Sequence, residues 1–312
     1  MIKKELKLPE EFYKEEVRND YKISSEMKKI WSIELDLFNQ LDRICKKHNI
    51  TYYADGGTLL GAVRHHGFIP WDDDMDFMMY RDDFEKLCSV ASEFKEPYFF
   101  QTEETDPGSL RCHAQLRNSK TTGILNFEKD KKYPFNQGIF IDIFPLDNVP
   151  ENRDERLKFV EELKKLKEQA REYYDFNHGF AEKPKITGFH TLWQRISFPN
   201  KKRNYKKLFE VYGEENPYYK EYKEKVTKYK DSTKYVMDIA VGTVNDVFKA
   251  SNISNPKYVP FEMMKMPIPE KYENVLNIYY GDWHKFVIGS SVHGECLFDV
   301  KVPYSQYLDK EK

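Results

Sequence analysis

Residues 53–76 read YADGGTLLGAVRHHGFIPWDDDMD, and this stretch decides how the first half of the chain is interpreted. The β-branched and aromatic residues over 50–54 are typical of a short strand, and Gly56-Gly57 is typical of a tight turn after it. Thr58 is the expected N-cap of a helix that follows the turn. A second strand is predicted over Met75–Tyr80. The succession of strand, glycine turn, helix and strand predicts an α/β fold.

Further elements flank this unit. Apolar residues recur at three- and four-residue steps over residues 24–48, which predicts an amphipathic helix capped by Ser24 or Ser25. Four more strand candidates follow, over residues 98–102, 110–116, 121–127 and 138–144. We therefore expect an α/β core over residues 1–150.

The second half of the chain, residues 151–312, differs in character. Asn152–Tyr174 predicts a charged helix, and Lys201–Lys230 contains ten Lys or Arg against five Glu. No Gly/Ser-rich linker separates the halves, so we expect a helical, basic elaboration packed on the core. Two interpretations of the basic stretch remain open: a solvated helix face, or a surface that faces an anionic polymer or lipid head groups.

The overall composition excludes several classes of protein. The 312 residues contain 50 Lys or Arg and 52 Asp or Glu, so the net charge of −2 argues against binding of nucleic acid by the whole surface. The four cysteines are far apart and form no C-x-x-C pair. No uninterrupted apolar stretch approaches the roughly 20 residues of a spanning helix. We expect a cytoplasmic protein whose contact with a membrane, at its inner face, is at most peripheral.

Paired carboxylates carry the predicted chemistry. On a strand that begins at Met75, Asp74 and Asp76 project from the same face, about 7 Å apart. Asp142 lies in the apolar stretch GIFIDIFP, residues 138–145, where burying a charge is costly unless a cation compensates it. Placed on a strand beside Met75–Met79, Asp142 would complete an oxygen site of the kind that Mg²⁺ or Mn²⁺ prefers.

Other candidates are less specific. Gly56 and Gly57 precede a helix start, where backbone N–H groups favour a phosphate. Arg64 could pair with an aspartate or clamp a phosphate, and Arg117 is a second candidate for a phosphate clamp. The remaining aspartates of the acidic run are expected to be solvated or to cap a helix; these are Asp73, Asp82 and Asp83.

Residues 53–76, together with IDIFPLD at residues 141–147, resemble the signature of the LicD family. The best-known members of that family are phosphocholine transferases of bacterial surface glycans, and fukutin-type glycan phosphotransferases are relatives. The resemblance covers residues 25–150 and, loosely, 261–283, whereas residues 175–258 match no family known to us. It implies a nucleotidyltransferase-type core with a mixed sheet of the α+β kind.

The resemblance also implies a reaction and a set of site residues. Mg²⁺ or Mn²⁺ would bind Asp74, Asp76 and Asp142, with Asp72 as an auxiliary ligand. The donor diphosphate would face the glycine turn, at Gly56, Gly57 and Thr58. The donor would be a CDP-linked alcohol such as CDP-choline, and CMP would leave. The acceptor would be a hydroxyl of a surface glycan, or of its lipid-linked precursor, of the teichoic acid or lipopolysaccharide type. Asp142 would take the proton of that hydroxyl.

Three alternatives remain open at this point. The first is transfer of another phospho-alcohol, such as phosphoethanolamine, glycerol phosphate or ribitol phosphate, from a CDP donor. The second is a true nucleotidyltransferase, which releases pyrophosphate. The third is a non-catalytic protein that binds a cation or a glycan through its acidic loop, although such a loop needs no aspartate in an apolar strand like that of Asp142.

Overall fold

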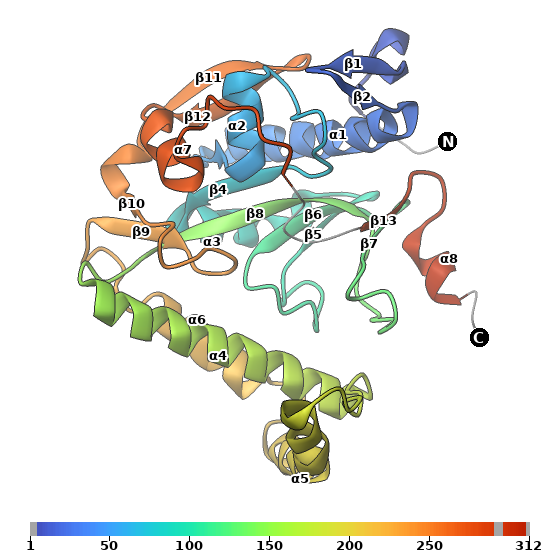
Figure 1. Cartoon of the computed structure of the whole chain (residues 1–312), viewed down its shortest axis with the longest axis vertical. Coiled ribbons are helices and arrows are strands. Elements are labelled where there is room, and N and C mark those ends of the chain that lie inside the picture. Colours follow the sequence, from blue (N-terminus) through green and yellow to red (C-terminus); the bar gives the residue numbers. More distant parts are fainter. Residues whose placement is uncertain (1–4, 290–295, 310–312) are drawn as a thin grey trace.

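The computed structural model describes residues 5–289 and 296–309, which fold around one mixed sheet (Figure 1). The sheet has the order β10-β9-β8-β4-β3, and β6 pairs with β8 and β5 with β6. Its strands are β3 (Tyr53–Ala54), β4 (Asp76–Tyr80), β5 (Tyr98–Gln101), β6 (Ala114–Asn118), β8 (Ile139–Asn148), β9 (Tyr235–Asp238) and β10 (Phe248–Lys249). The predicted α/β class with a mixed sheet is confirmed.

Strand β8 organises this sheet because it has neighbours along its whole length. On one side it pairs in parallel with β4. On the other side its first half pairs with β6 and its last residues pair with β9, both antiparallel. Most of its side chains are buried, as is typical of a strand covered on both faces.

The long helix α1 (Ser25–His48) covers one face of the sheet. Ser24 caps it, and the Ser24 side chain accepts a hydrogen bond from the backbone N–H of Met27, as predicted. The apolar stripe of α1 is buried, and its Trp31 stacks on Phe68 with ring centroids 4.4 Å apart. Figure 1 shows α1 and α2 (Gly56–Arg64) on one side of the sheet, and α4 (Arg153–His178) and α6 (Pro217–Val226) on the other.

Shorter elements complete the body of the molecule. Two-stranded antiparallel sheets are formed by β1 (Glu16–Arg18) with β2 (Tyr21–Ile23), by β11 (Pro256–Phe261) with β12 (Met264–Pro269), and by β7 (Thr122–Leu125) with β13 (Cys296–Asp299). The remaining helices are α3 (Arg81–Ser89), α5 (Phe189–Tyr212), α7 (Tyr272–Tyr280) and α8 (Tyr304–Asp309), with 3-10 turns at Glu10–Tyr13, Ala91–Glu93 and Ala250–Asn252.

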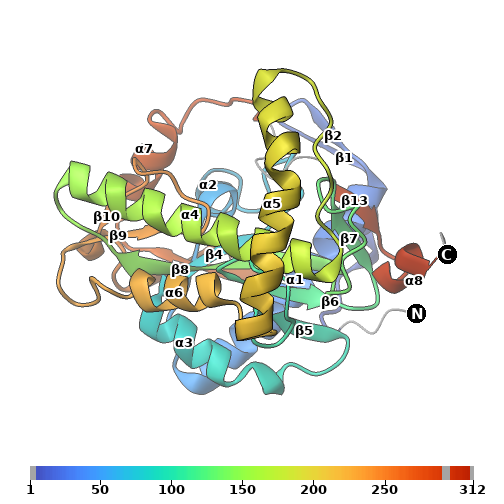
Figure 2. The ribbon, with the colours of Figure 1, turned by 90° about the horizontal axis from the view of Figure 1, so that it is seen from below.

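The second half of the chain is only partly the helical elaboration that we expected over residues 151–312. Helices α4 and α6 do form a layer of their own, and α5 lies across α4, as Figure 2 shows from below. After residue 234, however, the chain returns to the core, where β9 and β10 extend the main sheet. The hairpin of β11 and β12 packs near β3 and α2. The core therefore contains residues from both ends of the sequence.

A buried ion pair joins the start of α3 to β8. The guanidinium of Arg81 donates two hydrogen bonds to the carboxylate of Asp147, from Nε at 2.7 Å and from Nη2 at 2.6 Å. Asp147 is almost fully buried, and Arg81 is its one cationic partner among the described residues. The arginine therefore compensates the cost of removing the charge of Asp147 from water. The pair fixes α3 against the strand that carries Asp142.

We predict that Arg81→Met lowers the free energy of unfolding by about 3 kcal/mol, because it leaves Asp147 buried without its cation. The measurement is urea unfolding followed by circular dichroism. Arg43→Met, at an exposed position of α1, is the matched control and is expected to change stability by less than about 0.5 kcal/mol. Equal urea midpoints for Arg81→Met and the wild type would contradict the structural role of this pair.

Candidate active site

Asp76 and Asp142 are direct neighbours on parallel strands. Asp76 begins β4, and the register of β4 with β8 places it opposite Asp142. The backbone N–H of Asp142 also donates to the carbonyl of Met75, at 2.9 Å. The sequence-based expectation that Asp142 lies on a strand beside Met75–Met79 is therefore confirmed.

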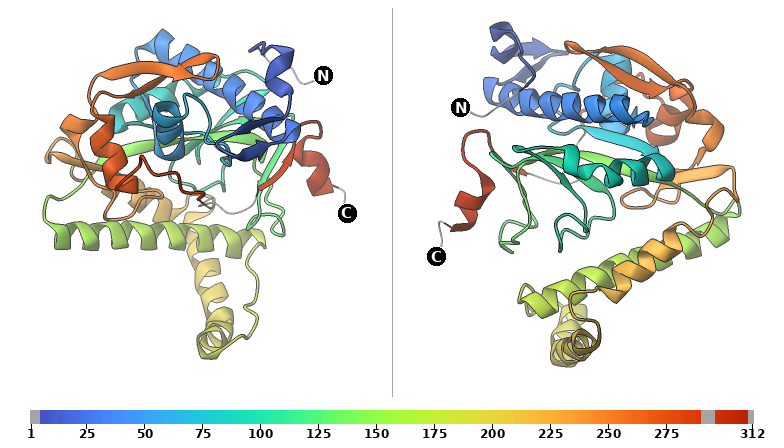
Figure 3. Two further views of the ribbon diagram at one scale, coloured as in Figure 1. Left: turned by 45° about the horizontal axis from the view of Figure 1, so that its top comes forward. Right: turned by 180° about the vertical axis from the view of Figure 1, so that it is seen from behind.

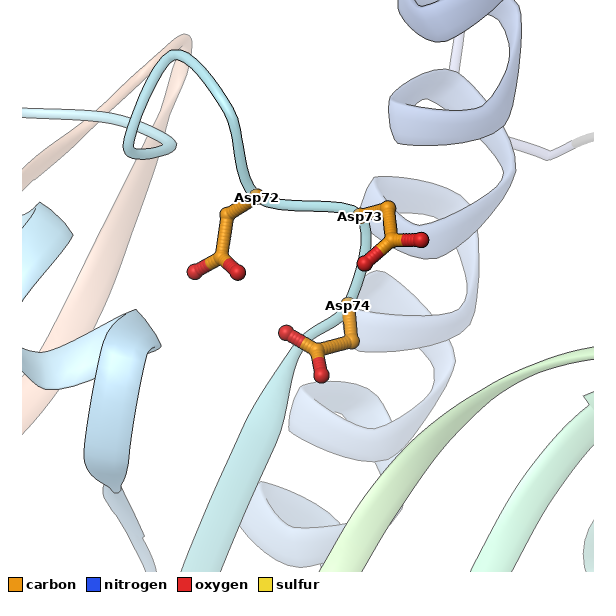
Figure 4. A group of neighbouring side chains, drawn as sticks. All are labelled: Asp72, Asp73 and Asp74. Carbon is orange, nitrogen blue, oxygen red and sulfur yellow. The ribbon is translucent and has the colours of Figure 1, made fainter. Parts of the chain in front are cut away.

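The loop that leads into β4 contributes three further carboxylates. Asp72, Asp73 and Asp74 each offer one carboxylate oxygen, and these oxygens all lie within 4.8 Å of one another (Figure 4). The indole N–H of Trp31 holds the loop against α1, because it donates to the carbonyl of Asp72 at 2.9 Å. Asp73, which we expected to be an ordinary solvated residue, thus belongs to the group. Together with Asp76 and Asp142, these residues are called the carboxylate cluster below.

The start of α2 lies against this cluster. The helix begins at Gly56, and its N-cap is Asp55, whose carboxylate accepts a hydrogen bond from the N–H of Gly56 at 2.8 Å. The expectation that Thr58 caps the helix is wrong. The Thr58 hydroxyl instead accepts a hydrogen bond from the N–H of Asp76, at 2.8 Å, which ties the helix to β4. Asp55 outcompetes Thr58 because it stands one residue before the helical turn, where a cap must lie.

Glycine is required at both positions of the pair. Gly56 has φ +47°, a conformation that residues with a side chain rarely adopt. A Cβ atom on Gly57 would lie 2.5 Å from a carboxylate oxygen of Asp72. The glycines therefore bring the positive end of the α2 dipole directly against two members of the cluster, Asp72 and Asp76.

The two central carboxylates have opposite electrostatic environments. Burial raises the pKa of Asp76 well above its ordinary value, and the negative charges of Asp74 and Asp142 raise it further. Burial also acts to raise the pKa of Asp142, but hydrogen bonds from His113 and Gln115 outweigh it and bring the pKa below its ordinary value. Without a cation, Asp142 therefore holds the negative charge and Asp76 tends to keep a proton.

Polar side chains of β6, and of His113 directly before β6, form a hydrogen-bonded series that holds Asp142. Nε2 of His113 lies 3.0 Å from Oδ1 of Asp142, and the amide of Gln115 donates to the same oxygen at 2.7 Å. The guanidinium of Arg117 in turn donates to Oε1 of Gln115. Both bonds to Asp142 end on Oδ1, and in the described part of the chain no donor contacts Oδ2.

Arg117 is therefore not placed where a phosphate could reach it. Its side chain is fully buried, and it also donates to Oε1 of Gln101 at 2.6 Å and to the carbonyl of Gly138 at 2.7 Å. Burial lowers the pKa of this guanidinium to about 9. In this structure Arg117 orients Gln115 and is no phosphate clamp, because the strand that carries it turns its side chain into the protein.

Arg64 lies at the other end of α2. Its Nη1 donates to the carbonyls of Trp283 and Lys285, at 2.8 and 2.9 Å, and its guanidinium lies over the ring of Phe286. It makes no ion pair with an aspartate among the described residues. In this structure Arg64 anchors the segment after α7.

Several polar groups around the carboxylate cluster were not predicted from the sequence. Glu34 of α1 is buried, and its Oε2 has no hydrogen-bond partner in the part of the chain that the structure describes. Burial together with the charges of Asp72–Asp74 raises the pKa of Glu34 well above its ordinary value. Asp55 is held by the hydroxyl of Tyr279 at 2.9 Å, and burial raises its pKa to about 6. His113 and Gln115 could have been found from their spacing, because with Arg117 they stand at every second position of the sequence at and just before β6, and side chains at that spacing share one face of a strand.

Comparison with known proteins covers the region of this site. Residues 49–193 match the family model described as LicD/FKTN/FKRP, nucleotidyltransferase domain. Over 118 residues the chain is 36% identical to the lipopolysaccharide cholinephosphotransferase LicD of Haemophilus influenzae. The aligned residues make up 37% of this chain and 42% of that protein. Over 76 residues the chain is 40% identical to uncharacterized proteins of Rickettsia prowazekii and Rickettsia typhi. These aligned residues make up 24% of this chain, 27% of the Rickettsia prowazekii protein and 24% of the Rickettsia typhi protein.

The chain thus spans less than half the length of each of these curated relatives. The matched residues 49–193 nevertheless include the whole carboxylate cluster and the helix start that faces it. Residues 49–193 of this chain therefore belong to the LicD family.

Proposed function

We propose that this protein transfers phosphocholine from CDP-choline to a hydroxyl of a bacterial surface glycan, or of its lipid-linked precursor, and releases CMP. Family membership and the relative named a cholinephosphotransferase support this activity. The observation that carries it is the pairing of Asp76 with Asp142 in front of the α2 N-terminus. The proposal includes a nucleotidyltransferase-type core and a cytoplasmic site of reaction.

The carboxylate cluster fits a divalent cation such as Mg²⁺ or Mn²⁺. All its candidate ligands are carboxylate oxygens, which these hard cations prefer. Asp76 cannot easily ionise beside Asp74 and Asp142 unless a positive charge is added. Asp74, Asp76 and Asp142 would hold the ion, with Asp72 as the auxiliary ligand. The bound cation supplies positive charge that neutralises the donor diphosphate and the departing CMP.

The residues of the chain position the donor and take the proton from the acceptor hydroxyl. The backbone N–H groups at the start of α2 attract the anionic diphosphate and orient it toward the cluster. His113 and Gln115 fix Asp142 by its Oδ1, which leaves Oδ2 to accept a proton. The acceptor oxygen then bonds to the phosphorus of the choline phosphate as the bond from that phosphorus to CMP breaks. The proton of the acceptor hydroxyl passes to Asp142.

The experiment that tests the activity is a donor panel. CDP-choline, CDP-ethanolamine, CDP-glycerol and CDP-ribitol are each incubated with the protein, Mg²⁺ and a lipopolysaccharide or teichoic acid acceptor, and CMP and pyrophosphate are quantified. We expect acceptor-dependent CMP release that is fastest with CDP-choline. Release of pyrophosphate would favour a true nucleotidyltransferase, and faster turnover of another CDP-alcohol would assign that alcohol.

We predict that Asp74→Asn and Asp76→Asn each reduce the rate of CMP release at least about a hundredfold, because each removes a ligand charge. Asp142→Asn is expected to be at least as damaging, since it also removes the proton acceptor. Asp82→Asn is the matched control: Asp82 lies on α3, is exposed, pairs with Lys230, and should leave the rate unchanged. A near-wild-type rate for Asp74→Asn or Asp76→Asn at saturating Mg²⁺ would refute the metal assignment.

The raised pKa of Asp76 predicts a pH dependence of stability in metal-free protein. Between the ordinary pKa of an aspartate and its raised value in the fold, the folded state binds more protons than the unfolded state, so stability falls as the pH rises. At pH 8, with a chelator present, Asp76→Asn should therefore melt at a higher temperature than the wild type. The difference should shrink as the pH falls toward pH 4, because the carboxyl of the unfolded wild type then also begins to bind its proton.

Differential scanning fluorimetry from pH 4 to pH 8 measures this effect. Asp142→Asn is the contrasting variant, because the pKa of Asp142 is lowered and its charge stabilises the fold above the ordinary pKa of an aspartate. If Asp76→Asn melts below the wild type at pH 8 without metal, Asp76 serves a structural role that the proposed site does not explain.

A further inference from the structure

Helix α5 projects from the body of the molecule (Figure 3). The side chains on its two faces differ in burial. One face packs on α4: Phe198 and Tyr205 lie against Phe176, with ring centroids 5.1 and 5.2 Å apart, and Phe209 lies 6.1 Å from Tyr173. These contacts fix which side of α5 is turned toward the protein.

The opposite side of α5 carries exposed apolar residues near its start. On a helix with 3.6 residues per turn, Leu192, Trp193 and Ile196 point about opposite to Tyr205 and Phe209. Their exposed fractions are 37%, 57% and 57%. These three residues form a row along the helix. We call it, with the residues that continue it further along α5, the outer face of α5.

Basic residues continue the same face. Arg203 and Lys207 follow Ile196 at seven and eleven residues, which returns them to the outer face, and both are exposed. Residues 181–212 contain eight Lys or Arg against two Glu, whereas the whole chain has a net charge of −2. The positive charge of this protein is therefore concentrated at α5 and the segment before it.

The pairing of the lysines distinguishes α5 from the rest of the basic stretch. In and around α6, Lys220, Lys223, Lys225 and Lys230 each pair with a carboxylate of the protein, as Lys201 does with Glu172. Four neighbours on α5 have no carboxylate partner among the described residues: Lys202, Arg203, Lys206 and Lys207. Of the two interpretations left open for Lys201–Lys230, the solvated helix face therefore describes α6, whose lysines are paired within the protein. The second interpretation, a surface that faces an external anion, fits α5.

We propose that the outer face of α5 binds the surface of an anionic lipid bilayer. Trp193 and Ile196 would enter the interface between head groups and acyl chains, and Arg203 and Lys207 would contact the lipid phosphates. A soluble polyanion would engage the basic residues but would leave the apolar residues in water, so the combination favours a membrane. The described part of the chain contains no helix that is long and apolar enough to span a bilayer, so the contact is at the surface. This inference does not depend on the proposed reaction.

The test uses the full chain and sedimentation with vesicles, without nucleotide. At 100 mM salt the wild type should bind phosphatidylglycerol vesicles at least about tenfold more tightly than phosphatidylcholine vesicles. Replacing Lys202, Arg203, Lys206 and Lys207 with Gln should abolish that preference. The matched control replaces Lys220, Lys223, Lys225 and Lys230 with Gln, which removes the same charge from paired positions and should retain most of the binding.

A second variant separates a membrane from a polyanion. Trp193→Gln with Ile196→Gln keeps every charge, and we expect it to bind phosphatidylglycerol vesicles at least about tenfold more weakly than the wild type and heparin equally well. Circular dichroism verifies that each variant is folded. Equal wild-type binding to the two kinds of vesicle overturns the proposal, as does equal loss in the α6 control. Unchanged vesicle binding by the Trp193 and Ile196 variant would also overturn it, and would assign the face to a polyanion.

Discussion

The parallel pairing of β4 with β8 is the constraint on which the rest of the site depends. It sets Asp76 beside Asp142 in the interior of a sheet, where two carboxylates repel each other and are poorly solvated. The surrounding elements hold these groups in place. Thr58 binds the backbone of Asp76, Trp31 anchors the aspartate loop, and the α2 N-terminus supplies a positive dipole. An arrangement that concentrates negative charge in this way is suited to a cation and to an anionic substrate that shares it.

Local patterns in the sequence predicted this centre well. Alternation along a strand and an aspartate within apolar residues were sufficient to anticipate that Asp142 lies beside β4, because both signals reside in short segments. Arg117 could not be placed in the same way. Its position in the sequence is compatible with a phosphate clamp. Only the packing of β6 against β8 reveals that the guanidinium of Arg117 donates its hydrogen bonds to Gln101, Gln115 and the carbonyl of Gly138.

Long-range pairing limited the rest of the prediction. Strands β9 and β10 are short, and residues 149–234, which contain α4, α5 and α6, separate them from β8 in the sequence. No local pattern records a pairing over that separation. Asp55 was overlooked as the α2 cap because the glycine pair after it suggested a turn of its own. In contrast, the amphipathic stripe of α1 and its cap were predictable, since helix period and capping are local properties.

We propose above that Asp74, Asp76 and Asp142 together bind a divalent cation. Anomalous diffraction from crystals grown with Mn²⁺ and CDP-choline tests this most directly. We predict Mn²⁺ within about 2.3 Å of oxygens from all three residues, with a donor phosphate oxygen completing the coordination. Mn²⁺ bound only to Asp72–Asp74, with Asp142 still held by His113 and Gln115 and remote from the ion, would contradict it.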